Sequence, residues 1–232
     1  MRSLILTLTI LFTCFGAKAQ GLTGKVENHP KKEMDVVLML FGMDNPITIG
    51  KVDPKGQISV NLEGVGIAGI PEEVRSMFMG ELIHNFYFSC GEPSAFGEMS
   101  GKPALRQDFL RLTQGDQWSG TVFLVSDEKL RPWLEDSGYS NAVKGSFYEI
   151  IYVEEDLAIN TTCSNQIIAS EEETVDVVYE FDLELKKGFN WVEYEILEIH
   201  ETNSEIRASF PSRVKVRNLK DPSTMKWIGA YF

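Results

Sequence analysis

Four acidic side chains on either side of residue 187 are the clearest candidates for chemistry in this sequence. Acidic and apolar residues alternate over 175–185 and again over 192–196, which is the two-residue period of strands with one buried face. A turn at Lys187-Gly188 joins the two stretches and predicts a β-hairpin whose acidic residues share the exposed face. The carboxylates that would face one another in pairs are Glu180, Asp182, Glu193 and Glu195.

These carboxylates require compensation, because like charges directly opposite each other destabilise a hairpin. A bound Ca²⁺ ion would supply it, with the four carboxylates as its oxygen ligands. Alternatively, a neighbouring basic strand would neutralise the face, since residues 206–226 hold six Lys or Arg against the single acid Asp221. We favour the basic strand, because calcium sites also take backbone carbonyls from a tight loop that this pattern does not indicate. We therefore predict no cofactor, with Ca²⁺ as the alternative.

Trp191 shares its strand phase with Glu193 and Glu195. If that phase faces outward, an exposed aromatic ring lies beside carboxylates, and the three residues form a patch suited to binding a glycan. Burial in the core is the commoner fate of a tryptophan. Carbohydrate binding is accordingly an alternative function for this chain.

Catalytic motifs are missing from the sequence. Its histidines, His29, His84 and His200, are isolated, and it contains neither a His-Glu-x-x-His pattern nor a Gly-x-Ser-x-Gly pattern. We therefore predict a protein that is not an enzyme. A hydrolase built on paired carboxylates is the alternative, since only the distance between two carboxylates in space would identify such a pair.

The N-terminal residues have the features of a secretory signal peptide. Arg2 precedes an uncharged run over residues 3–17, and Ala17-Lys18-Ala19 before Gln20 has the small-residue spacing of a cleavage site. The run is shorter than the roughly 20 apolar residues that span a bilayer. We expect cleavage near Ala19, removal of residues 1–19, a periplasmic or extracellular location in a bacterium, and no transmembrane helix in the mature chain.

Two cysteines, Cys90 and Cys163, remain after such cleavage. In an oxidising compartment they either form a disulfide or stay as two buried thiols. Sequence alone cannot decide between these alternatives, because a disulfide depends on the separation of the two residues in space.

The charge of the chain limits its partners. The formal net charge is −12, and removal of Arg2 and Lys18 with the signal peptide makes it more negative. Nucleic acids bind to clustered Lys and Arg, so we expect no nucleic-acid partner. A protein or a glycan at the cell envelope is the expected partner.

Short strands separated by turns dominate the rest of the chain. Strands are predicted at 23–27, 34–41, 47–52, 57–62, 84–90, 121–125 and 147–153, and Pro71 begins a short amphipathic helix near 71–83. A Gly-, Pro- and Ser-rich stretch over 91–101 suggests a boundary between regions 20–100 and 101–232, with a single domain as the alternative. The predicted fold is mainly β, with antiparallel β-sandwich-type sheets and one or two short helices.

Residues 22–62 resemble the prealbumin-like (carboxypeptidase-regulatory-like) β-sandwich modules of exported bacterial proteins. Gly24-Lys25-Val26 matches their Gly-x-Val strand, and Asp53-Pro54-Lys55-Gly56 matches the turn that follows later. The resemblance covers about a fifth of the chain and implies a β-sandwich fold. Such modules generally carry no catalytic residues, so the resemblance assigns no site.

The end of the sequence suggests one further class. Ile228 and Ala230 alternate before Phe232, a pattern similar to the terminal strand of a small outer-membrane β-barrel. The predicted helix and the continuous apolar strands favour a sandwich instead. We therefore predict an exported, non-enzymatic interaction or ligand-binding module of the cell envelope.

Overall fold

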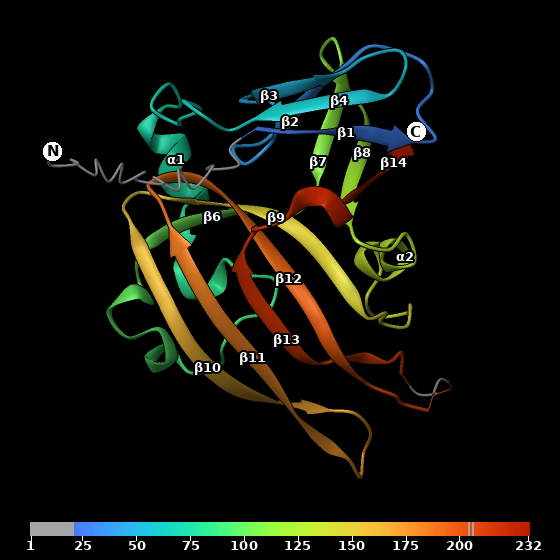
Figure 1. Ribbon diagram of the computed structural model, residues 1–232. Coiled ribbons are helices and arrows are strands. Elements are labelled where there is room, and N and C mark those ends of the chain that lie inside the picture. Colours follow the sequence, from blue (N-terminus) through green and yellow to red (C-terminus); the bar gives the residue numbers. More distant parts are fainter. Residues whose placement is uncertain (1–20, 204, 206) are drawn as a thin grey trace, which may run out of the picture.

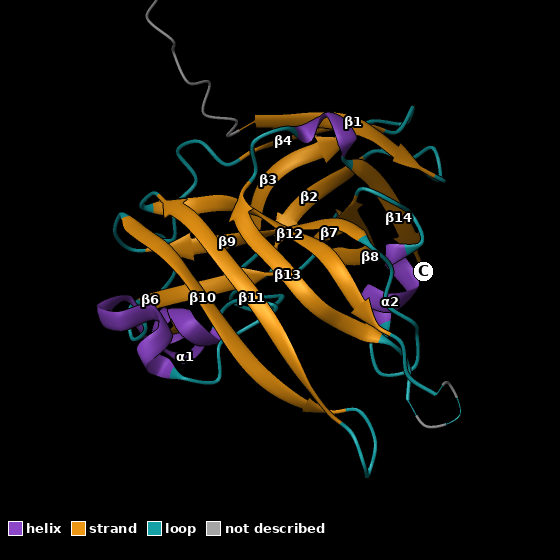
Figure 2. Ribbon diagram, turned by 60° about the horizontal axis from the view of Figure 1, so that its bottom comes forward, coloured by secondary structure: helices purple, strands orange, loops and turns teal. Residues whose placement is uncertain are grey.

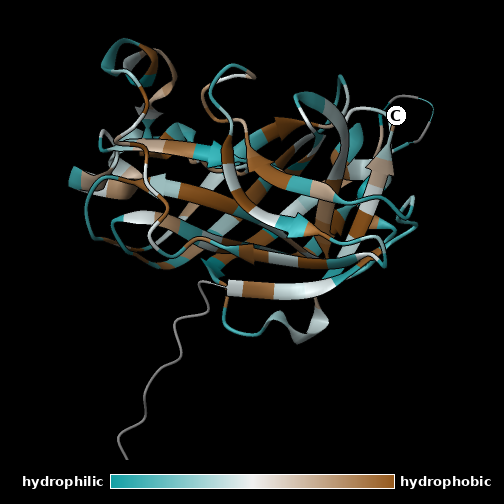
Figure 3. Cartoon of the chain, turned by 90° about the horizontal axis from the view of Figure 1, so that it is seen from above, coloured by the Kyte–Doolittle hydropathy of each residue, from teal (hydrophilic) through white to brown (hydrophobic). Residues whose placement is uncertain are grey.

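The computed structural model describes residues 21–203, 205 and 207–232. The predicted signal peptide and its cleavage site near Ala19 lie outside these residues. Strands make up 50% of the described residues and helices 12%, so the prediction of a mainly β fold with a few short helices is confirmed. Hydrophobic residues concentrate in the strands, while most of the connecting loops are hydrophilic (Figure 3).

The described residues form fourteen strands, two α-helices and three short 3₁₀ helices. The strands are β1 (Gly21–Glu27), β2 (Met34–Leu38), β3 (Ile47–Val52), β4 (Gln57–Asn61), β5 (Gly80–Glu81), β6 (Pro103–Gln107), β7 (Leu110–Gln114), β8 (Gln117–Val125), β9 (Gly145–Val153), β10 (Leu157–Ile168), β11 (Thr174–Leu185), β12 (Gly188–His200), β13 (Phe210–Asn218) and β14 (Lys226–Tyr231). The helices are α1 (Glu72–Phe78), α2 (Leu130–Glu135), η1 (Leu82–His84), η2 (Pro93–Met99) and η3 (Pro222–Thr224).

Seven strands close into a ring, which occupies the upper part of Figure 1. Their hydrogen-bonded order is β8-β14-β1-β4-β3-β2-β7, and β7 pairs back with β8. Every ring strand contributes buried apolar side chains to one cluster, the ring core. One member from each strand is Leu22, Val36, Ile49, Ile58, Leu112, Val122 and Trp227.

The turn between β3 and β4 is the one that the sequence predicts. Gly56 has a φ of +82°, a left-handed conformation that glycine adopts without steric cost. The Asp53 carboxylate accepts hydrogen bonds from the backbone N–H groups of Lys55 and Gln57 at 2.8 and 2.9 Å. The Asp53 side chain thereby stabilises the turn through contacts within four residues, which explains why the sequence pattern predicts it.

Five further strands form an open, twisted sheet in the order β10-β11-β13-β12-β9, which we call the large sheet (Figure 2). One of its faces packs against η1, η2, the irregular segment 85–92 and α2, and the buried side chains between them form the sheet core. Residues 84–90 are predicted to be a strand, and this prediction is wrong. Phe86 and Phe88 lie in bends after η1 and fill the sheet core without strand pairing.

β9 lies between the two cores, which accounts for its almost continuous apolar sequence. Phe147 and Ile151 belong to the sheet core, whereas Tyr148 and Ile150 belong to the ring core. A strand covered on both faces has no solvent-facing phase. The acidic residue Glu149 is therefore buried as well, with 3% of its surface exposed.

The predicted hairpin between 175–185 and 188–200 is wrong. β11 and β12 are joined only by Lys186 and Lys187, yet β13 lies between them, parallel to β11 and antiparallel to β12. A further parallel pair joins β1 and β14. Alternation revealed that β11 and β12 are strands but not which strands they pair with.

An asparagine side chain at the end of β13 holds the last part of β11. Asn218 accepts a hydrogen bond from the Glu184 N–H at 2.7 Å and donates one to the Glu184 carbonyl at 3.1 Å. In a parallel ladder, the N–H and the carbonyl of one residue bond to two different residues of the neighbouring strand. The single side chain of Asn218 instead bonds both groups of Glu184 where the backbone of β13 leaves the ladder.

Strands from both predicted regions, 20–100 and 101–232, build the ring, because β2 pairs with β7 and β1 with β14.

The predicted helix near 71–83 is present as α1, which has no buried residue. Met77 on this helix is 78% exposed. Within the described part of the chain, no helix is long and apolar enough to cross a membrane.

Candidate functional site

A cavity of about 180 Å³ lies at the junction of the ring and the large sheet. β8 and β9 pair only at Val125 and Phe147, and the two strands then diverge. The consecutive strands β6 and β7 cross the resulting gap, since β6 pairs with β9 and β7 with β8. The residues that line the cavity are Tyr87, Arg106, Asp108, Phe109, Phe123, Leu124, Leu134, Phe147, Tyr148 and Glu149.

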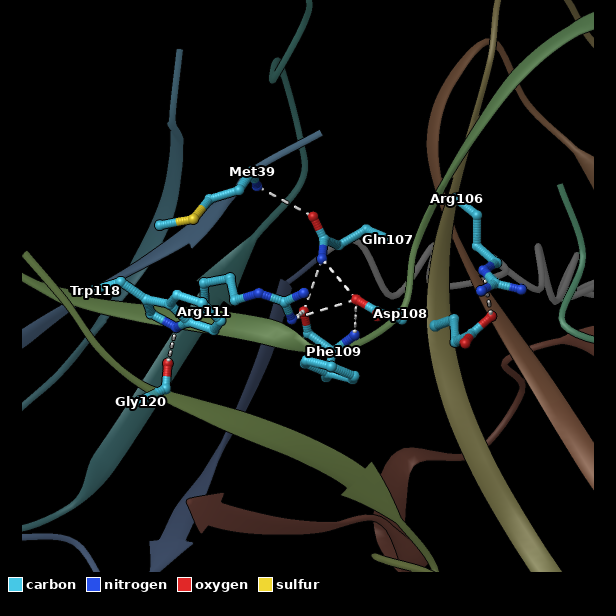
Figure 4. Close-up of polar contacts among 9 residues, drawn as sticks. Met39, Arg106, Gln107, Asp108, Phe109, Arg111, Trp118 and Gly120 are labelled. Carbon is cyan, nitrogen blue, oxygen red and sulfur yellow. Dashed lines mark hydrogen bonds and ion pairs between the residues drawn. The ribbon is translucent and has the colours of Figure 1, made fainter. Parts of the chain in front are cut away.

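The corner between β6 and β7 is fixed by the side chain of Gln107 (Figure 4). Its Oε1 accepts a hydrogen bond from the backbone N–H of Met39 at 3.1 Å. Its Nε2 donates to the Asp108 carboxylate at 3.1 Å and to the Phe109 carbonyl at 2.8 Å. Gln107 is buried, so this side chain ties the corner to the ring and orients Asp108 and Phe109 at the cavity.

Arg111 neutralises the charge of Asp108 at this corner. Its Nη1 lies 3.3 Å from Asp108 Oδ1 and donates to the Phe109 carbonyl at 3.0 Å. The guanidinium also stacks over the Phe109 ring at 3.9 Å and faces Trp118 at 5.2 Å, contacts typical of arginine. Asp108 additionally accepts a hydrogen bond from the Phe109 N–H at 2.8 Å. One oxygen of this carboxylate, Oδ1, is thus held by Gln107, by Arg111 and by the backbone of Phe109.

Glu149 is the buried titratable group of the cavity. Its Oε2 makes no hydrogen bond within the described residues, and the nearest cation, Arg106 Nε, lies 3.8 Å away, beyond hydrogen-bond distance. Burial raises the pKa of Glu149 to about 8, while Arg106 lowers it, Asp108 raises it and a hydrogen bond with Tyr194 lowers it. The carboxyl group is therefore mainly a neutral acid at pH 7.

Arg106 lies at the mouth of the cavity with a third of its side chain exposed. Its guanidinium faces the Tyr87 ring at 5.4 Å and makes no hydrogen bond to any described residue. The backbone N–H of Tyr87 in turn donates to the Tyr194 hydroxyl at 3.3 Å. The cavity consequently combines a cation with unused donors, a neutral buried acid and aromatic walls.

The four carboxylates predicted to face one another lie on β11 and β12, on either side of β13. Arg213 donates to Glu180 at 2.7 Å, and Arg217 lies 2.9 Å from Glu193 and 3.0 Å from Glu195. Asp182 is opposite Arg217 in the β11–β13 register. The basic strand thus compensates the acidic strands, and β13 keeps Glu180 and Asp182 apart from Glu193 and Glu195. Among the residues described, no group of three or more His, Cys, Asp or Glu could hold a metal ion.

Two of the three residues of the alternative glycan patch are buried, and the third, Glu195, is partly exposed and paired with Arg217. Trp191 is 5% exposed and belongs to the ring core. Glu193 is also buried, and its carboxylate accepts a hydrogen bond from Ser146 at 2.8 Å besides those from Arg217. The alternative of an outward phase is wrong for Trp191 and Glu193, because this part of β12 is covered on both faces.

Cys90 and Cys163 form a disulfide, which is one of the two alternatives that the sequence left open. The bond joins the irregular segment that carries Tyr87 to β10. Asn165 reinforces this connection, accepting from the Gly91 N–H and donating to the Ser89 carbonyl, both at 2.7 Å. One wall of the cavity is therefore attached covalently to the large sheet.

Sequence reasoning assigned no role to Glu149 or Arg106. The signal for Glu149 is present, since it is the single acidic residue within the apolar run 147–153. A carboxylate in a strand covered on both faces requires a partner or a raised pKa. Arg106 carries no comparable signal, because only the folded chain brings it beside Glu149.

Comparisons of the chain with protein-family models, with curated proteins and with solved structures found no match. The resemblance of residues 22–62 to prealbumin-like modules stays a prediction. Any function must therefore be argued from the cavity itself.

Proposed function

We propose that this chain is an exported, non-enzymatic binding protein that holds a small organic molecule in the Glu149 cavity. The observation that carries the proposal is the buried Oε2 of Glu149, which lines the cavity without a hydrogen-bond partner. Buried polar atoms nearly always have partners. A bound ligand would supply this one.

The surroundings of Glu149 support binding of an organic molecule. Cavities lined mainly by aromatic and aliphatic side chains with a few convergent polar groups are the usual form of small-molecule sites. Here Phe109, Phe123 and Phe147 supply the apolar walls, and Arg106 and Glu149 supply the polar groups. The cavity is small, so the molecule would be small too.

Export is supported by one prediction from the sequence and by one feature of the structure. The signal peptide predicted over residues 1–19 would direct the chain out of the cytoplasm. The Cys90–Cys163 disulfide belongs to an oxidising compartment, because structural disulfides are rare in the cytosol. A periplasmic or extracellular location in the cell envelope is part of the proposal.

The calcium and carbohydrate alternatives depended on residues that the structure engages elsewhere. Trp191 is buried in the ring core, and Glu193 is paired with Arg217. Neither side chain is available for a ligand without disruption of the fold. We therefore do not retain these alternatives.

A ligand screen on a cavity-blocking variant tests the proposal. Leu134 lines the cavity from α2, and Leu134→Trp would fill it. Glu135→Trp on the same helix places the same ring at an exposed position and serves as the control. Ligand-detected NMR with a library of ring-sized fragments should give fragments that bind the wild type and Glu135→Trp but not Leu134→Trp. The proposal fails if no fragment binds the wild type, or if the binders are unaffected by Leu134→Trp.

A further inference from the structure

On the basis of the proposed function, we infer that the ligand is a small monocarboxylate with an apolar body. Its carboxylate would pair with Arg106 at the mouth of the cavity, and its body would lie against the aromatic walls. The inference rests on the unused donors of Arg106, on the balance of charge in the cavity and on the size and lining of the space.

Arg106 is the group that would recognise the carboxylate. A guanidinium presents its N–H donors in a planar fork that matches the two oxygens of a carboxylate. Those donors form no hydrogen bond with the described part of the chain, and Glu149 at 3.8 Å does not supply one. The side chain is a third exposed, so a ligand can reach it from solvent.

The charge balance of the cavity favours a single negative charge on the ligand. Asp108 would repel an anion, but its carboxylate already interacts with Arg111, with Gln107 and with the backbone of Phe109. The charge of Arg106 is left without a full partner. A cationic ligand would lie beside that guanidinium and would be repelled by it.

The second carboxylate oxygen of the ligand has a donor in Glu149. The Oε2 atom of Glu149 lines the cavity and has no other partner, and its high pKa leaves a proton available to donate at pH 7. Ionisation of Glu149 would place a second negative charge beside the bound carboxylate. The charged and titratable groups that face Glu149 are Arg106 on β6, Asp108 at the corner, Tyr194 on β12 and Tyr87 in the irregular segment. Affinity should therefore decrease as the pH rises through about 8.

The volume limits the apolar body to about one ring. The cavity measures about 180 Å³, and an engineered apolar cavity of about 150 Å³ in another protein admits benzene. Phe109, Phe123 and Phe147 present aromatic surfaces to this space, which suit ring edges and faces. Benzoate therefore has suitable dimensions for a probe.

Three probes that share a phenyl ring but differ in charge test the inference: benzoate, benzamide and benzylamine. Isothermal titration calorimetry at pH 7 should show benzoate binding at least about tenfold more tightly than either analogue, a difference of about 1.4 kcal/mol. If benzamide or benzylamine binds as tightly as benzoate, the carboxylate inference is wrong while the cavity remains a binding site. If none of the three binds, the inference also fails, and the fragment screen above decides the proposed function separately.

Variants of the guanidinium separate a specific clamp from general charge attraction. Arg106→Gln should lower the benzoate affinity at least about tenfold and leave that of benzamide unchanged. Arg106→Lys keeps the charge but loses the planar fork, so it should recover only part of the affinity. Arg131→Gln is the control, because this guanidinium lies 5.9 Å from the centre of the Phe123 ring without lining the cavity. An equal loss of benzoate affinity in Arg106→Gln and Arg131→Gln would overturn the role of Arg106.

Discussion

Replacement of Glu149 by glutamine should change the pH dependence of stability more than any mutation of an exposed acid. The pKa of Glu149 is about 8 in the folded chain, against 4.5 for an unperturbed glutamic acid. Over this interval the folded state keeps a proton that the unfolded state has lost. The stabilisation by the protonated acid is therefore fully present below about pH 4.5 and is lost as the pH rises to about 8.

The size of the effect follows from the difference between the two pKa values. Each pH unit corresponds to about 1.4 kcal/mol, so an interval from 4.5 to about 8 amounts to about 5 kcal/mol of unfolding free energy. Glu149→Gln keeps the shape of the side chain and its hydrogen-bonding capacity toward Tyr194 but does not ionise. Relative to this variant, the wild type should lose about 5 kcal/mol between about pH 4 and about pH 9.

Denaturant unfolding at a series of pH values measures this difference directly. Both proteins carry the same other ionisable groups, so subtraction of the two curves isolates Glu149. The matched control is Glu63→Gln, which removes a carboxylate at an exposed position outside the cavity. The reasoning is refuted if the wild type and Glu149→Gln differ by a constant amount across this range, because Glu149 would then bind its proton equally in both states.

Three further changes test other parts of the fold by denaturant or thermal unfolding. Arg217→Met leaves the buried Glu193 carboxylate without its cation and should lower the unfolding free energy by about 3–5 kcal/mol. A double variant that also carries Glu193→Leu should recover stability if the unpaired charge is the cause, and no recovery would exclude that cause. Reduction of the disulfide, whose cysteines are 73 residues apart, should cost about 4 kcal/mol by the chain-entropy estimate, and an unchanged midpoint would show that the bond constrains little. Gly24→Ala places a Cβ 2.0 Å from the indole Nε1 of Trp227 and should cost at least about 1–3 kcal/mol by overpacking, whereas Gly66→Ala meets nothing within 4 Å and should be nearly neutral.

The positions of strands and turns could be predicted from the sequence better than the order in which the strands pair. β3 was predicted with its observed bounds, Ile47–Val52, and the turn after it was predicted because Asp53 and Gly56 determine it locally. These features depend on a few adjacent residues, whereas strand order depends on contacts between distant ones.

The failed predictions share a physical cause. Alternation sorts side chains into two faces but does not show whether a second layer covers the outer face, so the sequence left open whether Trp191 faces solvent, and the ring core buries it. The aromatic residues Phe86 and Phe88 resemble a strand because β-propensity largely reports packing against a surface. They make that packing from a segment without strand pairing.

The candidate site could be predicted only in part. Glu149 is conspicuous in an apolar strand, but its consequence depends on the divergence of β8 and β9, which pair at a single position. Arg106 reaches Glu149 only because the β6–β7 corner crosses that gap. No pattern within residues 103–114 indicates such a crossing.

The insertion of β13 between β11 and β12 has a consequence for how the chain reaches its folded state. Lys186 and Lys187 alone join the two acidic strands. Because contacts between residues close in sequence form fastest, a direct β11–β12 hairpin competes with the native arrangement during folding. That hairpin would bring carboxylates face to face, and their repulsion shortens its lifetime until the arginines of β13 arrive. Added salt screens this repulsion, and refolding should therefore become slower, not faster, as ionic strength increases.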